Sequence, residues 1–398
     1  MAERRFQTAT AATAALGPLL DRPEPPREED LSEGVRLAVD CITLPDGRFT
    51  NRYRLSWHPP RGHIRLLPVH TTAGDHAAAH PELLAVSTGG FFFLADDCAH
   101  RPRCLSLNLA VEDGVVHSLP SADQEALLRQ GGALSVAVVA ARGALEIDGQ
   151  RLRWAGSRTP HEAACRVASN ADIVVEHISD PDTGRRRTFQ PASRMSPPAG
   201  VGSTNLGLCR APDGTFEVIT ASGGPLDTFQ FDLVVRAPRG GVGSRVRIVD
   251  IDGHGLAGLS AISVGPSLHC ADLSEHPLNR ERSLGSTPLL LGRPSSRLVF
   301  YSTADGREHL CLLDGRPRSP LCPGVTLRET LDIVHRGADV VTGCFLDSGH
   351  TPRISLRLGA VRHNVGNRHY LRWPTVEDPT YLWIPEQGRA VSSLITVG

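Results

Sequence analysis

The sequence predicts an α+β fold, in which a large, mostly antiparallel sheet system carries few helices. Most of the chain consists of short stretches rich in β-branched residues, such as VRLAVDCITL, RYRLSWH, FQFDLVVRA and SRVRIVDIDG, separated by Gly, Asp or Pro turns. Helical periodicity is scarce by comparison, and no repeat with a fixed period is apparent. Runs of strands with a few separate helices are typical of α+β domains.

The chain is predicted to begin with a flexible segment, residues 1–30, because this part ends in the Pro- and charge-rich stretch DRPEPPREED. Residues 31–398 are long enough to form one large domain. Two hairpin reversals stand out within it, Asp305-Gly306 in TADGREHLCLLDG and the PDGTF stretch at 212–216.

Three stretches have a helical pattern. SADQEALLRQGG (121–132) has a Ser cap, an acidic first turn and Gly at its end, and DHAAAHPELLAV (75–86) is rich in Ala. The clearest is TLRETLDIVHRGAD, where Thr326 can cap the helix and Glu329 follows three residues later. The apolar run VVTGCF after it predicts a buried strand.

The composition excludes several function classes. A net charge of −1 gives no electrostatic signal for nucleic acid, and no run of apolar residues is long enough for a transmembrane helix. All 42 basic residues are Arg, which excludes a Schiff-base, pyridoxal-phosphate or Walker A lysine. No ligand set demands a metal, so we expect no cofactor. The Ala, Gly, Pro and Arg bias suggests a GC-rich bacterial gene.

The nine cysteines include no C-x-x-C pair, which argues against a zinc ribbon or a thioredoxin-like motif. The N-terminal apolar stretch is short and broken by Gly-Pro, so we expect a cytoplasmic protein rather than an exported one. Cys98 and Cys104 could close a small disulfide loop only if the protein were exported.

The turn LDSGHT near the C-terminus is the first candidate site. Two apolar runs flank it, so Asp347, Ser348, His350 and Thr351 are close together. Asp347 is near enough to orient the His350 imidazole for proton transfer. The alternative is a structural turn in which Asp347 accepts a hydrogen bond from its own backbone.

The second candidate is AVSTGGFFF, where Gly89 and Gly90 allow close backbone approach and their N–H groups could hold an anion. The alternative is a strand and turn with the three Phe residues as core anchors. RHNVGNRHY is predicted to be a polar loop whose Asn364 lines the site. VDIDGHG superficially resembles a calcium loop, but it lacks the later oxygen ligands and is predicted to be a plain turn.

The order of several blocks resembles the phosphodiester glycosidase domain family, which includes the lysosomal "uncovering" enzyme. The blocks are AVSTGGFFF, EIDG, RLVFYSTADGREHLCLLDGR, the stretch from GVTLRETLDIVHRGAD to AVRHNVG, and GRAVSSLITVG. The match spans roughly residues 32–398; it is strong at 85–93 and 297–364 and weak across 150–290. The resemblance implies a phosphodiester-glycosidase-like fold and a hydrolase that removes a sugar from an anomeric phosphodiester.

The resemblance also implies site residues, carried over one at a time. Asp347 matches the family Asp of L-D-G-G-G-S, and Thr351 matches its Ser. The residues matching the glycines of N-G-G-F-F, the strand Arg and the Asp of V-D-G-R are Gly89, Gly90, Arg297 and Asp314. This chain departs from the family where Thr88 replaces Asn, and where Ser348 and His350 replace glycines.

Three functions follow as hypotheses, all with a small-molecule substrate. The first is a hydrolase that cleaves a glycosidic or anomeric phosphodiester bond without a metal, with Asp347 and His350 as acid–base residues and the remaining residues binding substrate. The second is a natural-product biosynthetic enzyme (a cyclase, lyase, isomerase or transferase) with the same Asp/His pair. The third is a binding module without catalysis.

Overall fold

The computed structural model describes residues 22–67, 71–90, 109–168, 195–270, 273, 294–315, 319, 321–349, 351–366, 388 and 390–398, and the backbone of seven further short strands. Strands dominate: the helical elements among these residues are α2 (Ala73–Ala79), α5 (Leu327–Gly337) and the 3-10 turn η1 (Thr228–Gln230). The predicted α+β class is therefore wrong, because the protein is mostly β.

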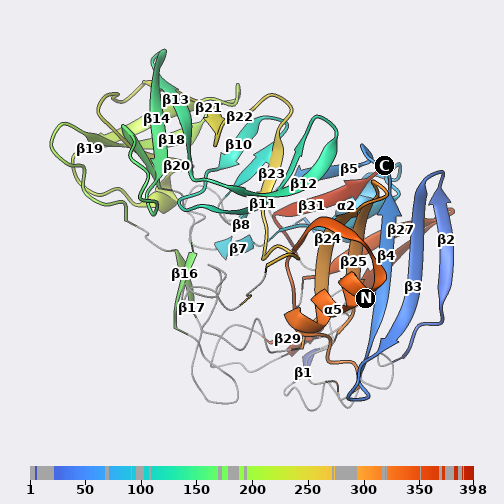
Figure 1. The fold of residues 1–398 in the computed structure, drawn as a ribbon. Helices are drawn as coiled ribbons and strands as arrows, with labels where there is room; N and C mark the ends of the chain where they lie inside the picture. The colour runs from blue at the N-terminus through green and yellow to red at the C-terminus, as the bar shows by residue number, and fades with distance from the viewer. Residues whose placement is uncertain are drawn as a thin grey trace.

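Two antiparallel sheets face each other as a sandwich, on the right in Figure 1. The first has the order β2-β3-β4-β25-β24-β26, with bounds Arg27–Ser32, Val35–Thr43, Phe49–Trp57, Glu308–Leu313, Arg297–Thr303 and Val340–Phe345. The second has the order β28-β27-β6-β31-β5, with bounds Val361–Gly366, Arg353–Leu358, Ala85–Thr88, Ser393–Val397 and Gly62–Leu66.

Side-chain alternation along β25 shows where the core lies. Leu310 and Leu312 point into the apolar cluster between the two sheets, whereas Cys311 and Leu313 point to the opposite face, which α5 covers. The central strands of each sheet are therefore buried on both faces, because α2 in turn packs on the outer face of the second sheet through Ala77.

Helix α5 begins as the sequence predicts. Thr326 Oγ1 accepts a hydrogen bond from Glu329 N at 3.1 Å, and the Glu329 carboxylate accepts one from Thr326 N at 2.7 Å, so the capping box is complete. The helix predicted over 75–86 is only partly correct, since α2 ends at Ala79. His80 precedes Pro81, which disfavours helical backbone, and the apolar residues that follow form β6.

Seven strands close into a β-barrel, at the upper left of Figure 1, because β21 pairs with β13. The ring runs β13-β14-β15-β20-β18-β19-β21, with bounds Arg142–Ile147, Gln150–Gly156, Cys165–Ala168, Leu233–Ala237, Thr204–Arg210, Phe216–Ser222 and Arg245–Ile251. The short strand β22 (His254–Gly255) extends β21 as a hairpin. The apolar cluster inside the barrel includes Leu145, Trp154, Phe216 and Val235.

A further sheet joins the sandwich to the barrel, with the order β10-β9-β23-β11-β12 and bounds Val115–Ser118, Ala110–Glu112, Ser260–Ser263, Gln124–Gln130 and Ala133–Val139. In β11, Leu127 packs in the sandwich core and Leu128 packs in the barrel core. The helix predicted over 121–132 is wrong for this reason. A strand with a core on each side is apolar at consecutive positions, and that pattern resembles a buried helix.

The remaining strands are short and described by their backbone alone: β1 (Arg5–Phe6), β29 (Tyr370–Arg372) and β30 (Tyr381–Trp383) form one sheet, and β7 (Phe92–Ala95) with β8 (Arg103–Ser106) and β16 (Ile173–His177) with β17 (Thr188–Pro191) form two pairs.

Several smaller predictions can be compared with the strands. The reversal at Asp305-Gly306 is confirmed, and Gly306 adopts the positive φ of +79° that the turn requires. The reversal in PDGTF is also confirmed, between β18 and β19. Strand β26 occupies the predicted VVTGCF segment. The flexible segment predicted over 1–30 is too long, because β2 already begins at Arg27 and pairs with β3.

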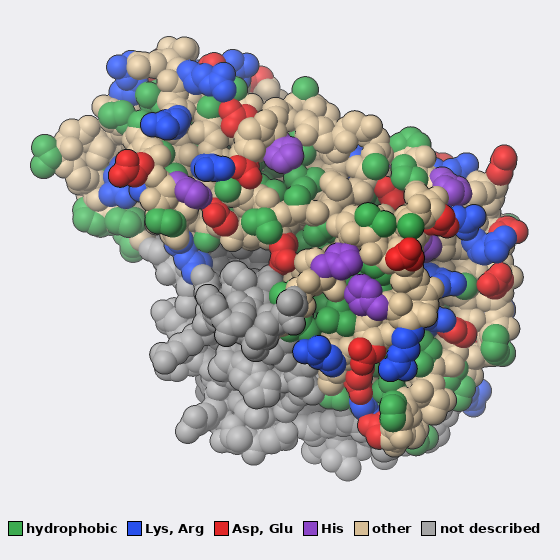
Figure 2. Space-filling model, viewed as in Figure 1, with side chains coloured by type: hydrophobic (Ala, Val, Ile, Leu, Met, Phe, Trp, Pro, Cys, Tyr) green, Lys and Arg blue, Asp and Glu red, His purple; other side chains and the backbone are tan. Residues whose placement is uncertain are grey.

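Basic and acidic side chains are mixed over the face seen in Figure 2, without a field of one sign. Within the described part of the chain, no helix is both long enough and apolar enough to cross a membrane.

Candidate active site at the Asp347 turn

The turn that holds Asp347 directly follows β26 and is fixed by two other segments. Asp347 N donates a hydrogen bond to Gly89 O at 3.2 Å, and Gly349 N donates one to Ser296 O at 3.0 Å. Gly89 follows β6 of the second sheet, and Ser296 precedes β24 of the first. The turn therefore lies at the ends of strands from both sheets, and it joins residues that are far apart in the sequence.

The turn has the local structure that Asp, Ser and Gly favour. One carboxylate oxygen of Asp347 accepts a hydrogen bond from Ser348 N at 2.7 Å, and Gly349 takes a φ of +77°. The structural interpretation of the turn is thus confirmed for Asp347. Both Asp347 and Ser348 remain half-exposed, so a substrate can reach them. His350 lies outside the described residues, and its pairing with Asp347 stays a prediction.

Arg297 lies beside this turn in the strand register. Val299 pairs with Phe345 and Leu346 N donates to Leu298 O, so this register, extended two residues beyond the end of β26, places Arg297 opposite Asp347. The Arg297 side chain is only 1% exposed, and its Nε donates to Val325 O at 3.1 Å.

Burial determines what Arg297 can do. Desolvation by burial lowers the pKa of its guanidinium to about 10, with the carboxylate of Glu329 acting in the opposite direction, so it remains a cation at neutral pH. A side chain this buried supplies positive charge from within the sandwich, and its predicted contact with a substrate stays a prediction.

Asp314 is also buried rather than open to a substrate. Its carboxylate accepts a hydrogen bond from Gly315 N at 2.8 Å, and its main chain bonds Asn51 and Thr50. Because Leu313 pairs with Arg297, the next residue, Asp314, also lies close to Arg297 in the sheet. The structure therefore places Asp314 near the site, but as part of the framework that holds the ends of β24 and β25.

The two glycines serve packing. Gly89 N donates to Ser393 O at 2.9 Å, and Gly90 N donates to Ser393 Oγ at 3.1 Å, so neither amide is available to an anion. A Cβ on Gly90 would lie 2.3 Å from Ser263 O, and one on Gly89 would lie 2.6 Å from Ser393 Oγ. The predicted anion cradle is therefore wrong: the missing side chains let β31 and β23 approach this segment.

The remaining predicted residues extend the site along β27 and β28. Thr88 is buried, and its Oγ1 accepts a hydrogen bond from Arg353 N at 3.2 Å, which fixes the start of β27. Thr351 is buried just before that strand. Asn364 of β28 pairs with Ser355 of β27. The Oδ1 of Asn364 is buried and accepts no hydrogen bond from a described residue.

Arg353 is the residue that the sequence interpretation missed. It is 1% exposed and pairs with Gly366, and a Cβ added to Gly388 would lie 3.4 Å from its Nε. Its signal was present in the sequence as an arginine that opens the apolar strand RISLRL immediately after the turn. A second buried guanidinium thus lies close to the chain segment that carries Asp347.

The described residues contain no group of three or more His, Cys, Asp or Glu side chains that could hold a metal ion. At VDIDGHG, the predicted plain turn is confirmed between β21 and β22. Asp250 and Asp252 there contact arginines, Arg151 and Arg142 respectively.

Comparison with known proteins gives the fold but not the family. No family model and no curated protein matches the chain. A crystal structure of a predicted exported protein from Burkholderia pseudomallei K96243 is similar, with a TM-score of 0.53 and 15% identity over 88% of this chain and 74% of that one. The catalytic domain of zebrafish N-acetylglucosamine-1-phosphodiester alpha-N-acetylglucosaminidase, auto-inhibited by its pro-peptide, aligns with a TM-score of 0.37 and 12% identity over 100% of this chain and 88% of that one.

Proposed function

We propose that this protein is a hydrolase that cleaves an anomeric phosphodiester bond at the Asp347 turn. The observation that carries the proposal is the convergence of three distant segments: Asp347 bonds the main chain of Gly89 and is aligned with the buried cation Arg297. The sequence resemblance to the phosphodiester glycosidase domains is strongest over the segments that hold these residues.

In the proposed reaction, a water molecule attacks the anomeric carbon while the bond from that carbon to the phosphate oxygen breaks. Asp347 accepts the proton of the attacking water or stabilises the positive charge that develops on the sugar. His350 donates a proton to the departing phosphate. Arg297 contributes fixed positive charge below the turn, where it needs no reorganisation during the reaction.

One observation favours a second candidate, a biosynthetic acid–base enzyme on the same scaffold. Both glycine amides that could have held a phosphate are already donated to Ser393. A substrate without a phosphate would not need them. The half-exposed Asp347 would then exchange a proton with a carbon or hydroxyl group, together with His350.

The test is Asp347→Asn, because an amide oxygen can still accept the Ser348 N–H hydrogen bond and preserve the turn. We expect the parent to release free sugar from a UDP-N-acetylhexosamine, and Asp347→Asn to lower kcat by about 100-fold or more. Asp305→Asn, in the exposed hairpin turn, is the matched control and should leave kcat and the melting temperature unchanged.

Full activity in Asp347→Asn would overturn the role of Asp347. A parent inert toward anomeric phosphodiesters would reject the hydrolase and leave the biosynthetic candidate. That candidate is tested with the same variants. The measurement is proton exchange on the small molecules that the enzymes encoded by the neighbouring genes make.

A further inference from the structure

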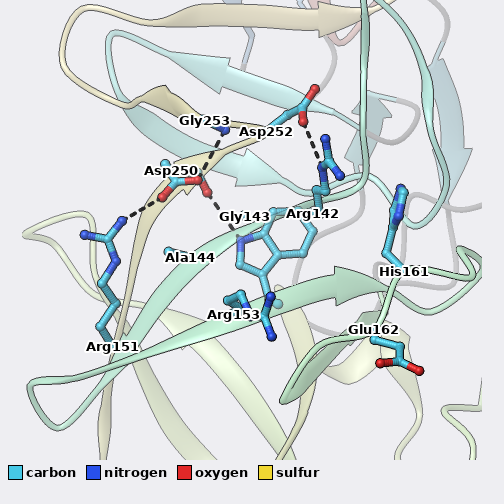
Figure 3. A pocket seen from close by; sticks show the side chains of 11 residues that line it. Arg142, Gly143, Ala144, Arg151, Arg153, His161, Glu162, Asp250, Asp252 and Gly253 are labelled. Atoms are coloured by element: carbon cyan, nitrogen blue, oxygen red, sulfur yellow. Dashed lines mark hydrogen bonds and ion pairs between the residues drawn. The ribbon is translucent and has the colours of Figure 1, made fainter.

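The barrel carries a cavity of about 650 Å³ that shares no residue with the Asp347 site. Its walls come from β13, β14, β21 and the loops that follow β14 and β21 (Figure 3). This volume is in the range of pockets that hold small organic ligands.

The hollow exists because a small residue occupies the middle of three neighbouring strands. Ala144 pairs with Arg153 on one side and with Asp250 on the other. A methyl group therefore stands between an arginine and an aspartate that rise from the flanking strands. In Figure 3 the labels of Gly143 and Ala144 lie among the charged side chains of Arg151, Asp250, Arg142 and Arg153, and both residues line the cavity.

Two ion pairs hold most of the rim in place. Arg151 Nη2 contacts Asp250 Oδ2 at 3.1 Å, and Arg142 Nε contacts Asp252 Oδ1 at 3.1 Å. Both carboxylates also accept backbone hydrogen bonds, Asp252 from Ala140 N at 3.0 Å and Asp250 from Gly253 N at 3.4 Å. Their side chains are about one-fifth exposed, so they are anchored but still present lone pairs to the cavity.

Two other charged residues of the lining are not engaged. Neither the Arg153 nor the Glu162 side chain makes a hydrogen bond or an ion pair with any residue in the described part of the chain, whereas the His161 side chain contacts Asp123 at 3.2 Å. Arg153 therefore keeps its guanidinium donors for a ligand, and Glu162 keeps its acceptors.

The charge of the lining decides between classes of ligand. Three arginines face three carboxylates, those of Asp250, Asp252 and Glu162, so the formal charge of the cavity is zero. A phosphate or a polyanion would gain the free arginine but would also lie against carboxylates. A sugar hydroxyl both donates and accepts, and therefore matches a rim on which donors and acceptors alternate.

We propose that this cavity is an accessory site for a neutral saccharide of one or two sugar units. Arg153 donates to hydroxyl oxygens, and Glu162, Asp250 and Asp252 accept from hydroxyl groups above the floor at Ala144. The cavity shares no residue with the Asp347 turn, so saccharide binding can be tested independently of the proposed hydrolase activity.

The test is calorimetric titration of the full chain with a panel of neutral mono- and disaccharides, and with inorganic phosphate as the anionic probe. We expect at least one saccharide to bind, and Arg153→Ala to weaken that binding by about tenfold or more, because hydrogen bonds from a charged donor are lost. Arg247→Ala is the matched control, since Arg247 is an exposed arginine of the same barrel that does not line the cavity.

Ala144→Leu is a second variant, and it should abolish binding because the larger side chain fills the floor of the cavity. Because Arg153 is exposed, Arg153→Ala should fold normally, so a loss of binding in that variant is not due to misfolding. The proposal is overturned if no saccharide of the panel binds, if phosphate binds in its place, or if Arg153→Ala and Arg247→Ala weaken saccharide binding equally.

Discussion

The sandwich is antiparallel throughout and the barrel is antiparallel except for the parallel pair β14 and β15, yet the two differ most in what they bury. In the sandwich, four Arg, Asp or Glu side chains are no more than 2% exposed: Arg297, Glu308, Asp314 and Arg353. On the described strands of the barrel no Asp, Glu or Arg side chain is this buried, and the charged pairs there are at least partly exposed.

Burying a charge costs free energy unless partners compensate for it, and groups kept in such environments are concentrated where chemistry or positioning needs them. Three of the four buried groups, Arg297, Asp314 and Arg353, lie close in the chain or in the strand register to the Asp347 turn. The contrast therefore assigns the sandwich to the candidate active site and the apolar barrel to a scaffold that can carry a ligand on its surface.

The largest expected effect on stability comes from changing a glycine to alanine in the sandwich, and it is compared with the same change beside the barrel. Gly90→Ala would place a Cβ 2.3 Å from the backbone oxygen of Ser263, so it should lower the free energy of unfolding by about 3 kcal/mol. Gly255→Ala in β22 is the matched change beside the barrel, where no atom lies within 4 Å, and should be nearly neutral. Denaturant unfolding measures both, and equal effects would break the comparison.

A smaller effect is expected at Glu308, whose carboxylate accepts hydrogen bonds from Trp57 Nε1 at 2.5 Å and from Leu134 N at 2.8 Å. Desolvation raises the pKa of this buried group. Glu308→Gln places an amide NH₂ against one of the two donors, and should cost about 2 kcal/mol in the free energy of unfolding.

The matched control on the barrel is Glu146→Gln, which removes a partly exposed pair with Arg247 and should cost about 0.5 kcal/mol or less. If Glu308→Gln were neutral or stabilising in urea unfolding, the carboxylate would be protonated in the native state, and the charge contrast between the two regions would be weaker.

The smallest expected effect is a pH dependence at His309. Its ring stacks on Tyr301 with centroids 4.7 Å apart, and desolvation lowers its pKa to about 4. Between this value and the unfolded pKa near 6.5, the unfolded chain binds a proton that the folded protein does not. Stability from the neutral ring is therefore fully present above about pH 6.5 and is lost as the pH falls toward 4.

From pH 7 to pH 5 this linkage should remove about 1.8 kcal/mol, and His309→Gln should abolish that part of the pH dependence. The exposed His58→Gln is the control and should leave it intact. Unfolding curves at several pH values measure how the free energy of unfolding changes with pH. If this change were the same in His309→Gln as in the parent, the ring would not be desolvated.

Local features of the fold could be predicted well. The capping box of α5 and the Asp305-Gly306 reversal each depend on residues that are three or four positions apart, so the sequence contains all of their contacts. Strand β11 could not be predicted, because Leu127 and Leu128 belong to two different cores that form only when the sandwich and the barrel both exist.

The candidate site shows the same division. The sequence indicated Asp347 and the turn that holds it, since Asp-Ser-Gly geometry is local. The glycine amides were misinterpreted, because their partner Ser393 is about 300 residues away in the chain. Arg353 was missed for a related reason: its burial follows from pairing with β28 and from the hydrogen bond of its N–H to Thr88, more than 200 residues away in the chain.

The sequence by itself determined that strands dominate, where several turns and one helix begin, and that no lysine chemistry is available. Only the tertiary structure decided that the chain closes into a barrel beside a sandwich, which donors are already used, and which charges are buried. The physical reason is that turns and caps depend on neighbouring residues, whereas closure, burial and hydrogen-bond satisfaction depend on partners brought together from distant parts of the chain.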